Sequence, residues 1–372
     1  MSTCSTCRSL GPRPPWTESF PPPTEDDERA RDSRIRGVLL GGALGEVVGT
    51  LVAEGGEVPA DPTPTSLRTE AATSLALFTA EGALRMLVRS HAKGIGPAWT
   101  VIRHAYDRWL FAQGLPAELV GRSWAGGGSS WPDGWLIAQH VLHRPVDGFP
   151  ATVAALRSTT VPSLSGQREI EPRPNASDGA GAVVRAAPVG LLVPADVAFE
   201  AGVRTAAFTH GGPVGSLGPG IVARLVAELV EHGDLGRALD AAQEELPGWP
   251  HHGRVAGVVE AAMAGEAAAG KAGVAGRSLH AALRGVWTDA GDPLATMTDA
   301  THAGGTAAAI ITGQLLGARL GHTAFAGRYR VALDVIGTIE RLRGIEGMST
   351  LGPYRDASRA RRTMTMRACV TA

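Results

Sequence analysis

A short glycine-rich segment, residues 174–181, has the residue types best suited to binding a small ligand. Its sequence is Pro-Asn-Ala-Ser-Asp-Gly-Ala-Gly, in which Asn175, Ser177, Gly179 and Gly181 are small and polar or flexible. The exposed backbone N–H groups of such a loop bind anions. A tight turn in front of a helix at residues 183–192 explains the same pattern, so both readings stay open.

Several other polar residues could take part in chemistry, but each also has a structural explanation. His210 begins the glycine-rich turn Thr209-His-Gly-Gly-Pro213, where we favour a capping or hydrogen-bonded core histidine over a catalytic one. For Arg185 we favour a structural ion pair over a contact with substrate. His251 and His252 lie in a loop rich in Pro and Gly, and we expect them to be exposed rather than to bind a metal.

The cysteines do not predict a metal site. Cys4 and Cys7 have the CxxC spacing, but a structural zinc site needs two more ligands, and no second CxxC or paired His lies nearby. We therefore interpret them as incidental thiols and expect no cofactor. With Cys369 as the only other cysteine, the sequence favours a reducing, cytoplasmic setting.

Composition and missing motifs exclude several classes of protein. The net charge of −1 and the pI near 6.8 argue against the basic face that nucleic acid requires. No Gly-x-Ser-x-Gly elbow, Walker loop or HExxH motif occurs. The uncharged run Ala303–Ala318 is short for a membrane span, and no apolar stretch precedes Arg36. We expect neither a signal peptide nor a membrane partner.

The elements that must position these residues are helices, because alternating β-branched runs are scarce. Apolar spacing predicts helices at residues 34–52, 69–88, 99–111, 198–208, 220–232 and 235–245, and a buried helix within 303–318. Glycines destabilise the first of these helices, which therefore needs tight packing against a neighbour. We predict loops near 112–134, 158–182 and 246–254. The helices form one all-α domain over 34–345, between a disordered Pro-rich tail (1–33) and a basic tail (346–372).

Six segments, in the same order along the chain, resemble the ADP-ribosylglycohydrolase family. They include the glycine-rich opening helix Arg34–Gly49, the loop and Arg-x-Ala-Pro segment Pro174–Gly190, and Ile311–Ala318; the others are 77–85, 105–110 and 209–213. The resemblance implies a single-domain orthogonal helical bundle. It also implies hydrolysis of an N- or O-glycosidic bond at the ribose of ADP-ribose, with two magnesium-type ions that orient the ribose and position water.

The sequence departs from the family at the residues that hold those ions. Phe78 and Glu81 fix one register, and Gly313 and Leu315 fix the other. The family's paired aspartates then fall on Ala71, Ala72, Gly304 and Thr306. The aspartate of the opening helix is Glu46, and that of the Asn-Asp-Ser loop is Ala176. Magnesium needs oxygen ligands, and two adjacent ions need several carboxylates, so the resemblance predicts a lost metal pair.

Three functions fit this combination. The first is a catalytically degenerate member that binds ADP-ribose or a related nucleotide through Asn175, Ser177, Gly179, Gly181 and His210, or that acts through a protein partner. The second is an active, divergent hydrolase that uses carboxylates without metal, for which Glu46, Glu70 and Asp178 are the acids a family-like fold would bring together. The third is a structural or interaction scaffold.

Overall fold

In the computed structural model every regular element among the described residues is a helix. The structure describes residues 24–58, 68–94, 97, 99–120, 134–143, 148–158, 160–164, 168–268, 272–289 and 291–326. The longer helices are α1 (Glu25–Ala53), α2 (Ala71–Lys93), α3 (Thr100–Ala112), α5 (Pro150–Arg157), α7 (Ala195–Ala207), α8 (Pro213–His232), α9 (Leu235–Glu245), α10 (Gly253–Ala264), α11 (Gly273–Trp287), α12 (Pro293–Gly304) and α13 (Thr306–Leu320). Shorter ones are α4 (Ala117–Val120), α6 (Ala187–Leu192), α14 (Thr323–Ala326), and the 3₁₀ turns Leu136–Ala138, His140–Leu142 and Leu246–Gly248.

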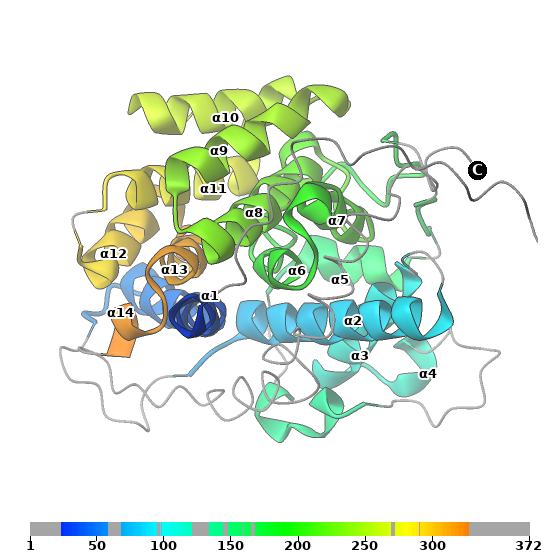
Figure 1. The fold of residues 1–372 in the computed structure, drawn as a ribbon. Helices are drawn as coiled ribbons and strands as arrows, with labels where there is room; N and C mark the ends of the chain where they lie inside the picture. Colours follow the sequence, from blue (N-terminus) through cyan, green and yellow to red (C-terminus); the bar gives the residue numbers. More distant parts are fainter. Residues whose placement is uncertain are drawn as a thin grey trace, which may run out of the picture.

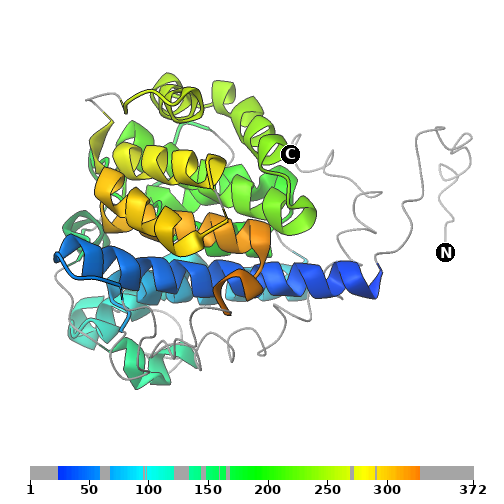
Figure 2. The same ribbon diagram turned by 90° about the vertical axis from the view of Figure 1, so that its left-hand side faces the viewer.

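The helix axes differ in direction, as the predicted orthogonal bundle requires: α1 and α13 lie side by side, and α2 runs across their direction. In Figure 1, α1 and α13 are seen almost end-on, whereas α2 lies lengthwise in the plane of view beside them. Helices α8–α12 lie on one side of α1 and α13, and α3 packs on α2 on the opposite side. Figure 2 shows α1 along its length, below α11–α13. The all-α prediction is confirmed.

Helices α1 and α13 approach so closely that their backbones touch. Four glycines of α1, spaced four residues apart, lie against α13: Gly37 against Gly317, Gly41 against Gly313, Gly45 against Ala309 and Gly49 against Thr306. A Cβ atom on Gly37 would lie 2.5 Å from the carbonyl oxygen of Gly317, and one on Gly49 would lie 2.8 Å from Cα of Thr306. The tight packing expected for this glycine-rich helix is therefore confirmed.

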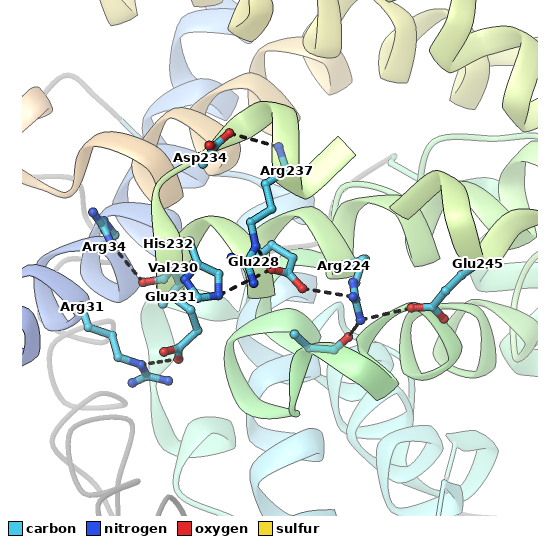
Figure 3. A network of polar contacts seen from close by, with 11 residues as sticks. Arg31, Arg34, Arg224, Glu228, Val230, Glu231, His232, Asp234, Arg237 and Glu245 are labelled. Atoms are coloured by element: carbon cyan, nitrogen blue, oxygen red, sulfur yellow. Dashed lines mark hydrogen bonds and ion pairs between the residues drawn. The ribbon is translucent and has the colours of Figure 1, made fainter. Parts of the chain in front are cut away.

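The start of α1 corrects the predicted N-terminal boundary. The helix begins at Glu25, so the stretch 25–33, predicted to be part of a disordered tail, is helical. Thr24 and Asp27 form a capping box at its first turn. Arg31 pairs with Glu231 at 2.6 Å, and Arg34 donates to the carbonyl of Val230 (Figure 3). These partners lie about 200 residues away in sequence, so the local charge pattern could not reveal them.

The same polar network anchors α9 on α8 (Figure 3). Glu228 is buried in α8, and its carboxylate lies 3.0 Å from Arg224 and 3.6 Å from Arg237 of α9. Arg224 also pairs with Glu245 at 3.1 Å, at the end of α9. A buried carboxylate needs such partners, because burial alone disfavours its charge. The network therefore ties the first turns of α1, the end of α8 and both ends of α9 together.

Three further outcomes concern segment boundaries. The helix predicted at 183–192 starts only at Ala187, because residues 180–185 form turns. Within the predicted loop near 246–254, a 3₁₀ turn precedes α10 at Gly253. Residues 1–23 and 327–372, which hold the three cysteines, most of the predicted N-terminal tail and the basic tail, lie outside the described residues.

Three helices have the length and composition of membrane spans, which the sequence analysis overlooked: Glu25–Ala53, Ala71–Ser90 and Pro213–His232. Of their most apolar windows, 72%, 78% and 83% respectively are buried inside the protein. Their apolar residues thus form the core: Leu75, Phe78 and Met86 of α2, at the predicted helical spacing, are at most 1% exposed.

The backbone contact between α1 and α13 predicts an unusual sensitivity to the smallest substitution. Gly41→Ala places a methyl group against the carbonyl of Gly313, and since only backbone can move, we expect a loss of at least about 3 kcal/mol of unfolding free energy. Gly257→Ala in α10 is the control, because nothing lies within 4 Å of its Cβ position and alanine favours helix by about 1 kcal/mol. Urea denaturation measures both. Equal stability of the two variants would contradict the contact.

Candidate functional site

The four positions predicted to have lost metal-binding aspartates lie around the second half of α1. Ala71 and Ala72 form the first turn of α2 and are 3% and 2% exposed. Gly304 ends α12 and Thr306 begins α13, on either side of Gly305 with φ 79°. Glu46 of α1 contacts the start of α2, and Gly49, one turn later, contacts Thr306. The fold thus brings both halves of the expected metal site to one stretch of α1.

Glu46, the one acid that remains, serves as the acceptor at the N-terminus of α2. Three backbone N–H groups donate to its carboxylate: Ala72 to Oε1 at 2.7 Å, and Glu70 and Thr73 to Oε2 at 2.9 and 3.1 Å. A carboxylate at a helix N-terminus accepts hydrogen bonds from N–H groups that have no partner within the helix, and its negative charge interacts favourably with the helix dipole. Burial raises the pKa of Glu46, although these hydrogen bonds and the Thr73 side chain act in the opposite direction.

The residues present do not fit a pair of magnesium ions. Glu70 has an exposed side chain, so one buried carboxylate is left near the predicted positions, and both of its oxygens accept hydrogen bonds. Nowhere in the part of the chain that the structure describes do three His, Cys, Asp or Glu side chains gather to hold an ion. Two divalent ions need several carboxylates, which this donor set does not supply.

Little space is left where the aspartates are missing, contrary to what their replacement by small residues suggests. Ala72 and Thr73 line a cavity together with Gln314 of α13, and water centres can occupy about 10 Å³ of it, roughly the space for one water molecule. A Cβ atom on Gly304 would lie 2.8 Å from Cβ of Ala281 and 3.0 Å from the carbonyl oxygen of Arg277. An aspartate at residue 304 does not fit unless α11 moves.

The glycine-rich loop at 175–181 is held by its own polar groups. Asn175 Oδ1 accepts from the N–H groups of Ser177 and Gly211, at 3.0 and 3.2 Å, and its amide donates to the Thr209 carbonyl at 2.8 Å. The Ser177 hydroxyl accepts from the Gly179 N–H at 3.1 Å. These contacts fix the loop against the turn that carries His210, so the structure brings all five predicted binding residues together.

Asp178 joins this loop to α8. Its Oδ1 accepts from the N–H groups of Val214 and Gly215, both at 2.8 Å, in the first turn of that helix. Its carbonyl accepts from the Ala275 N–H of α11 at 2.8 Å. Asp178 is therefore an N-terminal acceptor for α8, as Glu46 is for α2, and the two acids lie on different helix ends rather than as a catalytic pair.

His210 is a buried, neutral imidazole. It is 2% exposed, and burial, followed by the nearby charge of Arg185, lowers its pKa to about 3. Its Nδ1 lies 2.8 Å from the Thr209 hydroxyl. A Cβ atom on Gly179 would lie 3.3 Å from Nε2, so this nitrogen faces the glycine-rich loop. The predicted hydrogen-bonded core histidine thus also borders the predicted ligand loop.

Arg185 is buried without a carboxylate partner among the described residues, so the predicted ion pair is wrong. It donates to the carbonyls of Gly181 at 2.8 Å and Thr205 at 3.2 Å, and to the Thr209 hydroxyl at 2.8 Å. Its guanidinium carbon lies 4.6 Å from the ring centroid of Tyr106. Arg185 faces carbonyl oxygens because the preceding turn and the end of α7, not an acidic helix face, surround it.

A cleft opens beside the turn that carries His210. Leu217 and the buried Trp249 form part of its apolar wall. The volume of the cleft that the centres of water molecules can occupy is about 30 Å³. Arg168 stacks 5.7 Å above Trp249 and makes no hydrogen bond to a described residue. No Asp or Glu is among the described residues that line the cleft. The cleft therefore favours an anion with a flat or apolar part.

Two further cationic or polar side chains reach the same cleft. Arg173 donates from Nε to Glu171 and from Nη1 to the Gly211 carbonyl, both at 3.0 Å. His251 is exposed, as predicted, and its φ of 63° is a strained backbone conformation for a residue with a side chain. The sequence analysis did not single out Arg168, Arg173 and Trp249, which line the cleft. The only local signal was the aromatic residue in the turn Gly-Trp-Pro-His at 248–251.

Comparisons with known proteins give a family and a fold. The profile of the family described as ADP-ribosylglycohydrolase matches residues 27–353. A solved structure described as an "ADP-ribosylglycohydrolase-related protein complex" is similar to 84% of this chain over 96% of its own, with a TM-score of 0.53 and 23% sequence identity. No curated protein matches the sequence. At this identity the structural likeness concerns the fold, while the profile covers most of the chain.

The capping role of Glu46 predicts a loss of stability when its charge is removed. In Glu46→Gln an amide N–H₂ group faces backbone donors, so we expect a loss of about 1–3 kcal/mol of unfolding free energy. Glu57→Gln, at an exposed acid after the end of α1, should change it by less than about 0.5 kcal/mol. Denaturant titration at pH 7 measures both. A Glu46→Gln protein as stable as the parent would rule out this cap.

The lowered pKa of His210 predicts a specific response to acid. Between pH 6.5 and about 3 the unfolded chain binds a proton at His210 that the folded protein does not. Stability is therefore full above pH 6.5 and falls as the pH drops, by about 3 kcal/mol at pH 4.5 for this group alone. His210→Gln should lose less stability than the parent between pH 7 and 4.5, and His302→Gln, at an exposed residue of α12, should behave as the parent. Identical pH profiles for His210→Gln and the parent would contradict a buried neutral imidazole.

Proposed function

The chain belongs to the ADP-ribosylglycohydrolase family, and we propose that it is a catalytically degenerate member that binds ADP-ribose or a related nucleotide without magnesium. The proposal rests on the hydrogen bonds of Glu46, the acid nearest the positions expected to hold metal. Its carboxylate accepts from three backbone N–H groups at the start of α2. The other positions carry Ala71, Ala72, Gly304 and Thr306, of which only the threonine offers a side-chain oxygen.

Packing at the former metal positions also supports the loss of hydrolysis. Ala71 and Ala72 belong to the hydrophobic core, and the cavity beside Ala72 has room for about one water molecule. Hydrolysis by two carboxylates without metal has little support, because Glu46 and Asp178 cap different helices and the Glu70 side chain is exposed.

The binding half of the proposal rests on the cleft beside His210. Of the five predicted binding residues His210 lines this cleft, whereas the glycine-rich loop touches it only through the preceding Pro174. Two arginines, two histidines and a buried tryptophan are among the lining residues. Arginine forks suit phosphate oxygens, and an indole face suits a flat ring. These are the two chemical features of ADP-ribose and of other nucleotides.

Binding and hydrolysis can be separated by experiment on the full chain. We expect ADP-ribose to raise the melting temperature by the same amount with Mg²⁺ and with a chelator, because ligand binding to the folded state alone stabilises it. We also expect no release of ADP-ribose from ADP-ribosyl-arginine above background. A temperature shift that requires Mg²⁺, or hydrolysis that stops on chelation, would return the protein to the two-metal mechanism.

Arg168 allows the cleft to be tested directly. Arg168→Met keeps most of the side-chain length but removes a cation that has no hydrogen bond to any described residue, so we expect ADP-ribose to bind about 10-fold more weakly. Arg89→Met, at an exposed arginine of α2 that does not line the cleft, is the matched control. Isothermal titration measures both. Equal affinities would place the ligand elsewhere, and an absence of any binding would favour the scaffold function.

A further inference from the structure

The hydrogen bonds behind His210 determine which of its nitrogens carries the proton. The carbonyl oxygen of Ala206 accepts from the backbone N–H groups of Thr209 and His210, both at 2.9 Å. A carbonyl oxygen has two lone pairs, so both are used. The Thr209 hydroxyl lies 3.2 Å from this oxygen, longer than the usual O–H···O distance of about 2.8 Å. That oxygen is therefore a poor acceptor for the hydroxyl proton.

Arg185 limits the hydrogen bonds that the Thr209 hydroxyl can donate to a single acceptor. Its Nη2 donates to Thr209 Oγ1 at 2.8 Å, and a guanidinium cannot accept a hydrogen bond. The remaining near neighbour of the hydroxyl is Nδ1 of His210, also at 2.8 Å. The hydroxyl proton thus points at Nδ1, which must be the unprotonated nitrogen of the neutral ring. The proton of the imidazole then lies on Nε2.

Nε2 is aimed at the proposed ligand region. His210 lines the cleft, and Nε2 makes no hydrogen bond to a described residue although the side chain is 2% exposed. A Cβ atom on Gly179 would lie 3.3 Å from Nε2. Nε2 is not fully buried, so a water molecule or a ligand oxygen in the cleft can accept from it.

We propose that Arg185 and Thr209 are positioning residues that hold His210 as a neutral Nε2–H donor for an acceptor oxygen of the bound ligand. The ligand class is a nucleotide phosphate or ribose oxygen, and this part rests on the proposed function. A neutral donor binds such an oxygen without the proton uptake that a charged histidine would need. The contacts Arg185 to Thr209 and Thr209 to His210 act in series, and neither Arg185 nor Thr209 needs to touch the ligand.

Nitrogen NMR of the ¹⁵N-labelled full chain tests the tautomer in the absence of any ligand. The His210 signals are identified among those of the 11 histidines by their loss in His210→Gln. We expect the parent and Thr209→Ser to show a single neutral Nε2–H form. Thr209→Val removes the hydroxyl at nearly constant volume, so its His210 should show a mixture of both tautomers. Thr209→Ala replaces it if the valine variant does not fold, as judged by circular dichroism.

The outcomes separate this proposal from the proposed function. An Nδ1–H form in the parent, or an unchanged Nε2–H form in Thr209→Val, would overturn the relay whatever the protein binds. If the relay holds, ADP-ribose should shift the Nε2–H signal, and Thr209→Val should bind it about 5-fold more weakly while Thr209→Ser restores parental affinity. Binding that leaves this signal and these affinities unchanged would overturn the ligand contact. Failure of the parent to bind ADP-ribose would instead refute the proposed function and leave the tautomer result standing.

Discussion

The contact of α1 with α13, backbone against backbone, is the constraint on which the rest of this structure depends. Each glycine of the α1 series costs helix stability, and together they allow two helices to approach without intervening side chains. The approach places Glu46 and Gly49 beside the starts of α2 and α13. The site positions are therefore set by a contact that contains no functional group, and the remaining helices build outward from this pair.

Two acids of this protein serve helix ends, and a third joins two helices. Glu46 accepts from α2, Asp178 accepts from α8, and Glu228 holds the arginines that join α8 to α9. A carboxylate in such a position is not free to ligate a cation or to exchange a proton with substrate. Two arginines line the cleft near His210. Arg173 pairs with Glu171, whereas Arg168 stacks on Trp249 and interacts electrostatically with Glu245.

Sequence reasoning succeeded where the pattern is local. The helices at 71–93, 100–112 and 235–245 have apolar spacing that specifies them, and the absent aspartates are visible directly in the sequence. It failed where the deciding partner is distant. The contacts that hold the helix at 25–33 against α8 are with Glu231 and Val230, and the surroundings of Arg185 depend on Thr205 and Thr209. The cleft joins residues 168–173, 203–217 and 249–251, which no spacing rule connects.

The replacement of the aspartates has a consequence for single substitutions. Restoring an acid at residue 72 would bury a second negative charge beside the Glu46 carboxylate, and restoring one at 304 would collide with Ala281 and the Arg277 carbonyl. Neither change alone creates a site for an ion, and each one alone destabilises the protein. Building a metal site at these positions would therefore require several substitutions made together.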